Sequence, residues 1–260
     1  MKQLAGAMFV RNGIKYDYCF REAIHSLLNF CDEVFVVDAG STDGTLQALH
    51  SIRHPNLKVI SLSEKEWNKQ SGRGKEKLCY FSNLAIDYAE LNDYEYVFYC
   101  QADEVVHENS YWRIRELCNF GKDGYVISRI NLWGSPYYQL DVENERLPCS
   151  RFVLRLSKSQ FRTDGDAESI AVPYDNVYMA ESVKMYHMGF VRDRKVMIHK
   201  TIEMQENVFE LGTHDEKIDI SGKYFKPELW FDLKKDIKLI DEPLPATVKE
   251  WAKKRVYKLN

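Results

Sequence analysis

The feature that most constrains the fold is a series of short apolar runs that alternate with helical patterns in the first half of the sequence. The segment 33–38 contains four consecutive apolar residues, which is typical of a strand buried on both faces of a parallel sheet. Apolar residues at helical spacing follow these runs. The alternation predicts an α/β fold with a doubly wound, mostly parallel sheet flanked by helices. The expected strands are 4–10, 33–38, 57–62 and 94–100, and the expected helices are 18–30, 45–52 and 77–91.

The regular alternation stops near residue 120. Beyond it we expect a long polar loop over 134–150, and a linker at 241–245. One large domain over 1–211, with a small helical extension over 212–260 packed on it, is therefore the expected organisation. The further expected strands are 125–132, 151–156 and 183–191, and the further expected helices are 195–211 and 246–259.

Composition and charge exclude several classes of protein. The chain has 260 residues, of which 45% are hydrophobic and 29% charged, as in globular proteins and unlike disordered chains or coiled coils. Its net charge of −3 provides no global attraction for nucleic acid. The six cysteines lack Cys-x-x-Cys spacing, so we expect reduced thiols rather than a zinc site. No apolar stretch approaches 18 residues, so we expect no membrane span and a cytoplasmic location.

The first polar motif follows the expected strand 33–38. It reads Asp-Ala-Gly-Ser-Thr-Asp-Gly-Thr from Asp38 to Thr45. In open parallel sheets, ligands bind at the carboxyl ends of the strands. Asp38 and Ser41 can hydrogen-bond a polar ligand there, but an ordinary strand-to-helix turn explains the motif equally well when it is taken alone.

The second polar motif follows the expected strand 94–100 and reads Gln101-Ala102-Asp103-Glu104. Adjacent carboxylates repel each other and are best tolerated beside a cation or in solvent. Carboxylate oxygens suit Mg²⁺ or Mn²⁺, which commonly bridge a phosphate. A solvated acidic loop is the alternative interpretation of this motif alone.

Taken together, the two motifs and their spacing resemble family 2 glycosyltransferases of the GT-A (Rossmann-like) fold. The strand leading into Arg11-Asn12 and the pair Ser82-Asn83 on the helix before the acidic motif are also similar to that family. The resemblance is clear over residues 4–108 and weaker up to about residue 205.

The resemblance implies a role for each matching residue. Asp38, with Val10 and Arg11, would bind the base or ribose of a nucleoside diphosphate sugar, for which a UDP-sugar is the expected donor. Asp103 would bind Mn²⁺ or Mg²⁺ at the donor diphosphate, with His187 as a second ligand or a diphosphate contact. The other expected donor contacts are Ser41, Lys77, Gln101 and Ala102.

The resemblance also implies an inverting transfer, in which a carboxylate deprotonates the acceptor hydroxyl. The segment Gly165-Asp166-Ala167-Glu168 lies where related enzymes carry this base. Many relatives have a His-Glu pair there, so Glu168 is the preferred candidate and Asp166 is the alternative.

Two positions depart from the family pattern. Gln101 replaces the first acid of the usual Asp-x-Asp, and an amide cannot share the charge of a metal. Ser82 replaces a basic residue that often precedes the helix asparagine, and Lys77, Lys75 or Arg73 would supply the missing positive charge.

The acceptor is less constrained by the sequence. An acceptor glycan, a lipid-linked sugar and a hydroxylated base in DNA all remain open, and the sugar transferred is either a hexose or a pentose. The basic segment 248–259 leaves peripheral contact with a membrane open. A local basic cluster could reach an acidic ligand or only solvent; its members are Arg192, Arg194, Lys195, His199 and Lys200.

Two other function classes remain open. A nucleotidyltransferase would use a similar sheet and a carboxylate-bound Mg²⁺, but it normally has a glycine-rich loop after the first strand, where this chain has only Gly13. A catalytically decayed module that binds sugar nucleotides would explain Gln101 as a lost metal ligand.

Overall fold

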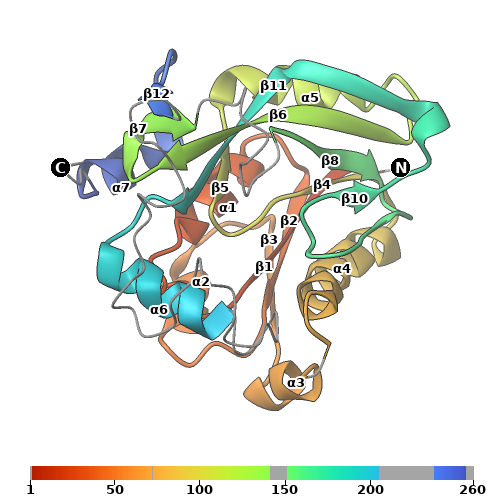
Figure 1. The fold of residues 1–260 in the computed structure, drawn as a ribbon. Helices are drawn as coiled ribbons and strands as arrows, with labels where there is room; N and C mark the ends of the chain where they lie inside the picture. The colour runs from red at the N-terminus through yellow and green to blue at the C-terminus, as the bar shows by residue number, and fades with distance from the viewer. Residues whose placement is uncertain (1, 72, 141–150, 205–236, 256–260) are drawn as a thin grey trace.

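The computed structural model of the protein describes residues 2–71, 73–140, 151–204 and 237–255. They form an α/β fold built on a mixed ten-stranded sheet, with helices on both of its sides (Figure 1). The predicted α/β class is confirmed. The strand order along the main path is β12-β7-β6-β8-β4-β1-β2-β3, and β11 pairs with both β6 and β5.

The first half of the chain forms the parallel part of the sheet. Alternate side chains of β1 enter two different cores: Leu4 and Met8 pack with α1, whereas Ala5 and Ala7 pack with α4. This explains why the strands of this half are almost wholly apolar. The parallel strands are β1 (Lys2–Val10), β2 (Glu33–Asp38), β3 (Leu57–Ser61) and β4 (Tyr94–Tyr99), and the intervening helices are α1 (Phe20–Leu28), α2 (Thr45–Ser51), α3 (Glu64–Lys69) and α4 (Glu76–Leu91).

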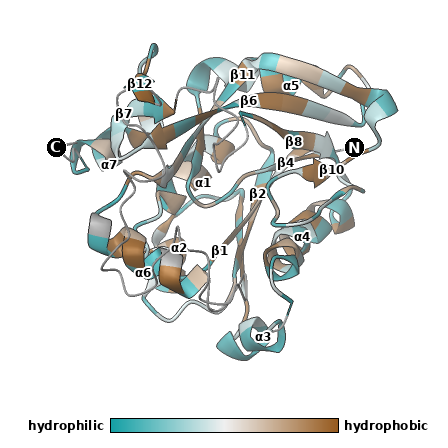
Figure 2. Ribbon diagram, viewed as in Figure 1, coloured by the Kyte–Doolittle hydropathy of each residue, from teal (hydrophilic) through white to brown (hydrophobic). Residues whose placement is uncertain are grey.

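The second half extends the same sheet, mostly with antiparallel pairs. β8 lies antiparallel to both β4 and β6, and the long β11 lies parallel to β6 and antiparallel to β5. Hydrophobic residues run along β6 and β8, while α3 is mostly hydrophilic (Figure 2). The elements are β5 (Glu104–Val106), η1 (Glu108–Ser110), α5 (Tyr111–Leu117), β6 (Gly124–Trp133), β7 (Ser135–Leu140), β8 (Phe152–Lys158), β9 (Arg162–Thr163), β10 (Ile170–Ala171), η2 (Tyr174–Asn176), β11 (Val177–Phe190) and α6 (Arg194–Met204).

The expected loop over 134–150 is wrong in its first part, because β7 (Ser135–Leu140) is a strand. Gly134 has a φ of +64°, which allows the chain to reverse directly after β6. The Trp133 ring packs against Phe190 with ring centroids 4.4 Å apart, and Leu140 is buried. These contacts stabilise a hairpin in place of the expected loop. Residues 141–150 lie outside the described residues.

The described end of the chain packs on the main body. Val248 and Ala252 are buried in the same core as α1, and Arg255 forms an ion pair with Asp17. The expected terminal helix is shorter than predicted, with the last elements being β12 (Ile237–Leu239), η5 (Ala246–Val248) and α7 (Lys249–Lys253). The expected boundary between residues 211 and 212, and the end of the expected helix 195–211, lie outside the described residues.

Two further expectations concern cysteines and the membrane. Five cysteines are buried and free of disulfides in the described part of the chain, and Cys149 lies outside it. Among the helices that the structure describes, none has the length and apolar character needed to cross a bilayer.

Candidate active site

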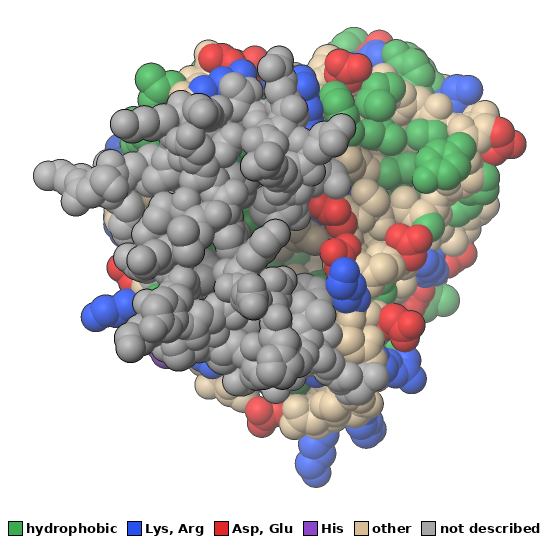
Figure 3. All heavy atoms as spheres, viewed as in Figure 1, with side chains coloured by type: hydrophobic (Ala, Val, Ile, Leu, Met, Phe, Trp, Pro, Cys, Tyr) green, Lys and Arg blue, Asp and Glu red, His purple; other side chains and the backbone are tan. Residues whose placement is uncertain are grey.

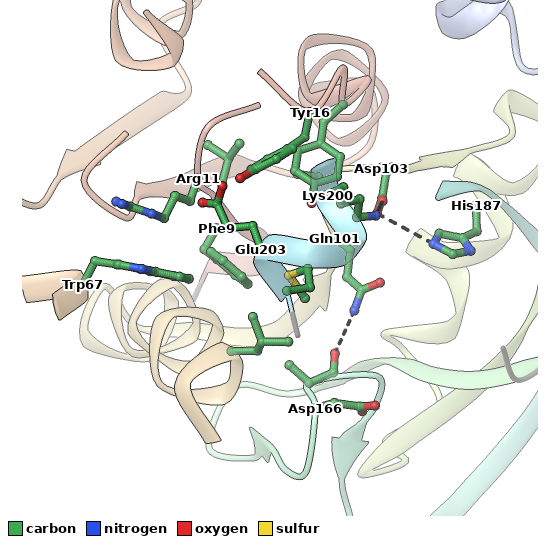
Figure 4. Close-up of a pocket in the computed structure, with 16 residues that line it drawn as sticks. Phe9, Arg11, Tyr16, Trp67, Gln101, Asp103, Asp166, His187, Lys200 and Glu203 are labelled. Atoms are coloured by element: carbon green, nitrogen blue, oxygen red, sulfur yellow. Dashed lines mark hydrogen bonds and ion pairs between the residues drawn. The ribbon is translucent and has the colours of Figure 1, made fainter. Parts of the chain in front are cut away.

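A cavity of about 180 Å³ lies at the carboxyl ends of β1 and β4, where an open sheet is expected to bind its ligand. Its walls come from segments far apart in the sequence, including the acidic motif after β4, the strand β11 and the helix α6 (Figure 4). The predicted site residues that line it are Val10, Arg11, Gln101, Ala102, Asp103, Asp166 and His187. Asp38, Ser41, Lys77 and Glu168 lie outside the described lining.

Asp103 is a buried carboxylate surrounded by cations. Its Oδ2 lies 3.3 Å from Lys200 Nζ and 3.3 Å from Arg192 Nη2. Burial alone would raise the pKa of Asp103, but the charges of Lys200 and Arg192 outweigh burial and hold that pKa well below its ordinary value. Asp103 is therefore ionised at neutral pH. Lys200 and Arg192 belong to the basic cluster seen in the sequence, and the structure directs both of them to this carboxylate.

His187 faces the other oxygen of the same carboxylate, with its Nε2 3.8 Å from Asp103 Oδ1. Burial lowers the pKa of His187 to about 3, so the imidazole is neutral at pH 7. Its Nδ1 lies 3.0 Å from Asn131 Oδ1, which can only accept, so Nδ1 carries the proton. The lone pair is then on Nε2, the nitrogen that faces Asp103.

This pair of donors fits a divalent cation. An ionised carboxylate and a neutral imidazole are both metal ligands, and the bond to Asn131 fixes the tautomer, as outer partners of ligating histidines commonly do. No cluster of three His, Cys, Asp or Glu side chains suited to a metal occurs among the described residues. Two protein ligands suit a cation that takes its other ligands from phosphate and water, as Mg²⁺ does.

The space for the His187 ring depends on Gly189. A Cβ atom at position 189 would lie 2.3 Å from His187 Nε2, closer than any packing allows. The expected result of Gly189→Ala is displacement of the imidazole and at least a tenfold weaker response to Mn²⁺, in line with the loss expected when a ligand is misplaced (about tenfold to a hundredfold). A thermal-shift titration with Mn²⁺ and nucleotide measures this effect. Gly121→Ala is the control for backbone strain, because a Cβ there meets no described atom within 4 Å and only the φ of +68° opposes alanine. An unchanged Mn²⁺ response in Gly189→Ala would contradict the role of His187.

The strand-to-helix turn after β2 lies next to the cavity, but Asp38 and Ser41 of this turn are not among the residues that line it. Asp38 is 1% exposed; its Oδ2 accepts a hydrogen bond from Ser41 N, and its Oδ1 has no partner among the described residues. Gly40, with a φ of +72°, packs so closely on Ser63 that a Cβ would lie 2.7 Å from its backbone. The turn is therefore tightly packed and keeps one buried carboxylate oxygen available for a polar group.

Trp67 is a cavity residue that the sequence analysis missed. The Arg11 guanidinium lies 4.6 Å from its ring centroid and the Lys77 ammonium 4.2 Å. Arg11 also donates hydrogen bonds to the carbonyls of Ala39 and Gly40. These contacts give Arg11 and Lys77 structural partners and create a cationic rim around an aromatic face. Since Trp67 lies on a short helix far in sequence from Arg11, only the tertiary structure reveals this arrangement.

The two candidate bases point in different directions. Asp166 lines the cavity, whereas Glu168 forms an ion pair with the buried Arg129. Between them, Ala167 has a φ of +61°, the left-handed conformation that a residue with a Cβ rarely adopts. Of the two carboxylates, Asp166 is thus the one that faces the cavity.

A buried charge network supports the wall of the site. Glu104, fully buried, lies 2.6 Å from Arg155 Nη2 and 3.5 Å from Arg129 Nη1. Glu104 Oε2 also accepts a hydrogen bond from the backbone nitrogen of Gln101, at 2.8 Å. The second acid of the sequence motif is therefore a structural anchor for the strands β6 and β8 rather than a residue of the cavity.

Comparison with known proteins identifies one family. Residues 19–134 match the model described as glycosyl transferase family 2. No curated protein matches the chain. Among solved structures, residues 1–349 of S. aureus TarS are 16% identical, with 90% of this chain and 73% of that chain covered and a TM-score of 0.46. The same TarS segment in complex with UDP is 15% identical, with the same coverage and TM-score. A longer TarS structure is 16% identical, with 79% of this chain and 40% of that chain covered and a TM-score of 0.45.

The family match includes the turn after β2 and the acidic motif after β4, the two motifs on which the resemblance was based. The resemblance to family 2 glycosyltransferases is confirmed. Asp166, His187 and Lys200 lie beyond the matched residues, so their place in the site depends on the structure alone.

Proposed function

We propose, from the match of residues 19–134 to glycosyl transferase family 2, that this protein transfers a sugar from a nucleoside diphosphate donor to an acceptor hydroxyl. The observation that carries the proposal is the buried, ionised Asp103 at the end of β4, which faces His187 across the cavity. Such a position suits the donor diphosphate, whose departure is the costly charge separation of the reaction.

We assign the nucleoside of the donor to a position at the ends of β1 and β2. Val10 and Arg11 line the cavity there, and Asp38 keeps a buried oxygen available for a base or ribose donor. Ser41 shapes this turn by accepting a hydrogen bond from Asn12 N at 2.9 Å. Lys77 contacts the ring of the cavity residue Trp67, and Gln101 and Ala102 line the cavity. We propose a UDP-sugar as the donor.

We assign the diphosphate of the donor to a position beside Asp103, His187 and Lys200. When bound to Asp103 and His187, Mn²⁺ or Mg²⁺ would supply positive charge against the leaving diphosphate. Lys200 and Arg192 hold Asp103 ionised, and Lys200 also lines the cavity, where its ammonium can face a phosphate.

The proposed reaction is an inverting transfer with Asp166 as the base. Asp166 supplies a carboxylate on the cavity side opposite Arg11, where an acceptor hydroxyl can be deprotonated as it attacks (Figure 4). Glu168, the candidate preferred from the sequence, is ion-paired with Arg129 and is assigned a supporting role.

Paired substitutions distinguish these two assignments. Asp166→Asn is expected to reduce transfer about a hundredfold while nucleotide binding is retained, because general base catalysis contributes at least that much. Glu168→Gln is expected to have a much smaller effect, and it serves as the matched control. The measurement is the initial rate of nucleoside diphosphate release from the donor with acceptor present. A larger loss in Glu168→Gln than in Asp166→Asn would reverse the assignment.

The acceptor remains a glycan, a lipid-linked sugar or a hydroxylated base in DNA. On the face shown in Figure 3, acidic and basic side chains of the described residues are interspersed, and hydrophobic ones gather at the upper right. A DNA acceptor requires a positive groove. Arg192 and Lys200 of the basic cluster are directed to Asp103, which leaves fewer of its charges to form such a groove, and we favour a sugar acceptor.

A thermal-shift panel tests the function directly. Nucleoside diphosphates and sugar nucleotides are each added with and without Mn²⁺, and a ligand that binds the native state raises Tm by mass action. We expect a shift with one nucleotide diphosphate, enhanced by Mn²⁺, followed by sugar release in a turnover assay. Binding without turnover would favour the decayed module, pyrophosphate release from a nucleoside triphosphate would favour a nucleotidyltransferase, and the absence of any shift would refute the proposal.

A further inference from the structure

Gln101, the amide that replaces an acid in the family pattern, makes a hydrogen bond that an acid could not make. Its Nε2 donates to the backbone carbonyl of Ala167 at 3.2 Å. A carbonyl oxygen only accepts, so its partner must carry a hydrogen. An ionised aspartate or glutamate at position 101 would instead place negative charge against that oxygen.

The carbonyl that Gln101 holds belongs to a strained residue. Ala167 is 1% exposed and has a φ of +61°, which is costly for a residue with a Cβ and persists only where its surroundings enforce it. Arg155 Nη1, at 3.4 Å, is the second donor to the same carbonyl. Two donors from β8 and the end of β4 therefore fix the left-handed turn.

The turn at Ala167 determines where the neighbouring carboxylates lie. Asp166 faces the cavity, while Glu168 reaches Arg129. The beginning of the segment is held independently, because the Asn83 side chain makes three hydrogen bonds to Thr163, at 2.8, 2.8 and 3.1 Å. The turn itself has an internal hydrogen bond from Ala167 N to Asp164 O at 2.9 Å, and Cys79 Sγ lies 3.3 Å from the Gly165 carbonyl. Gln101 adds a donor to the Ala167 carbonyl from inside the cavity (Figure 4).

We propose that Gln101 is a positioning residue that sets Asp166 in the cavity by holding the Ala167 turn, and that it is neither a metal ligand nor the relic of one. The part that concerns catalysis rests on the proposed function, since it takes Asp166 as the base. The part that concerns the turn is independent of any activity. An amide at this position is thereby explained as the donor that this particular turn requires.

Hydrogen exchange tests the turn without any activity. In the full chain, Gln101→Met, which keeps the side-chain length and removes the donor, is expected to exchange roughly threefold to tenfold faster over a peptide spanning residues 162–171, the effect of losing one net hydrogen bond. Gln101→Glu, which adds repulsion, is expected to exchange at least as fast. The matched control is Gln3→Met, which removes an amide donor bonded to Asn119 at 2.8 Å, far in sequence from the site. Unchanged exchange over 162–171 in Gln101→Met would overturn the proposal.

Kinetics tests the positioning role. In Gln101→Met, kcat for transfer is expected to fall at least tenfold, because a misplaced catalytic group costs up to about a hundredfold. The donor KM and the Mn²⁺ dependence of nucleotide binding are expected to stay within about twofold of the wild-type values. A weaker Mn²⁺ response with unchanged exchange would instead make Gln101 a ligand to the metal and overturn the proposal. Absence of transfer by the wild type would refute the proposed function, and the exchange result would still decide the turn.

Discussion

Asp103→Asn is expected to reduce sugar release from the donor by about a thousandfold, since charge stabilisation of the leaving group is worth several kcal/mol. The substitution keeps the shape of the side chain and removes its negative charge. It leaves the fully buried guanidinium of Arg192 and the ammonium of Lys200 without their carboxylate. The enhancement of nucleotide binding by Mn²⁺ is expected to disappear with the activity. Steady-state turnover and the thermal-shift response to Mn²⁺ measure the two effects.

Asp17→Asn is the matched control for this prediction. Asp17 also forms an ion pair with an arginine, but that partner is Arg255 at the described end of the chain. Its turnover is expected to equal that of the wild type. A folded Asp103→Asn variant that retains wild-type turnover would exclude Asp103 from the reaction, whatever its effect on stability.

Glu104→Gln is expected to lower the free energy of unfolding by about 3–5 kcal/mol, the effect of removing one partner from a buried ion pair. Glu104 and Arg155 are both fully buried, and Arg129 is nearly so. Glutamine keeps the volume of the side chain, so the loss reports on charge rather than on a cavity. Equilibrium unfolding in urea, with the midpoint and slope compared between variants, measures this difference.

The control for Glu104→Gln is a pair in solvent. Glu250 and Lys253 are largely exposed on α7, and exposed pairs contribute little to stability. Glu250→Gln is expected to leave the urea midpoint unchanged. If Glu104→Gln were as stable as Glu250→Gln, the buried network would not stabilise the fold.

The sequence predicts the parallel half of the fold well because the signal there is local. An apolar run such as 33–38 can hardly avoid burial on both faces, and the structure places it in the interior of the sheet. The polar motifs that follow such runs are then brought to one edge by the topology alone. Val10 and Asp103 meet at the cavity for this reason.

What the sequence could not predict depends on contacts between distant segments. For Lys200 and Arg192 the sequence left an acidic ligand or solvent open, since nothing local shows that both reach a carboxylate about 90–100 residues earlier in the chain. For Glu104 the sequence left a cation site or a solvated loop open, because Arg129 and Arg155 reach it from strands of the second half. Trp67 and the strand β7 were missed for the same reason.

The sequence could not decide between the two candidate bases for a different reason. Asp166 and Glu168 are separated by Ala167, and which one faces the cavity depends on a left-handed φ at that alanine. Alanine carries no sequence signal for such a conformation, whereas Gly165, two residues earlier and with a φ of +58°, is where a sequence would lead one to expect it. Only the donors that hold the Ala167 carbonyl reveal the turn.

The position of α6 late in the sequence has a consequence for how the protein folds during synthesis. Lys200 and Glu203 complete the wall of the cavity, yet they follow every strand of the parallel half in the sequence. During synthesis from the N-terminus, the segment that matches the family emerges and can begin to fold before the counter-charges of Asp103 exist. A chain in which α6 has not yet docked therefore lacks the Lys200 ammonium beside Asp103 and part of the cavity wall. If the protein binds a nucleotide as proposed, binding would require that α6 has docked, and a bound nucleotide would selectively stabilise chains that have reached that state.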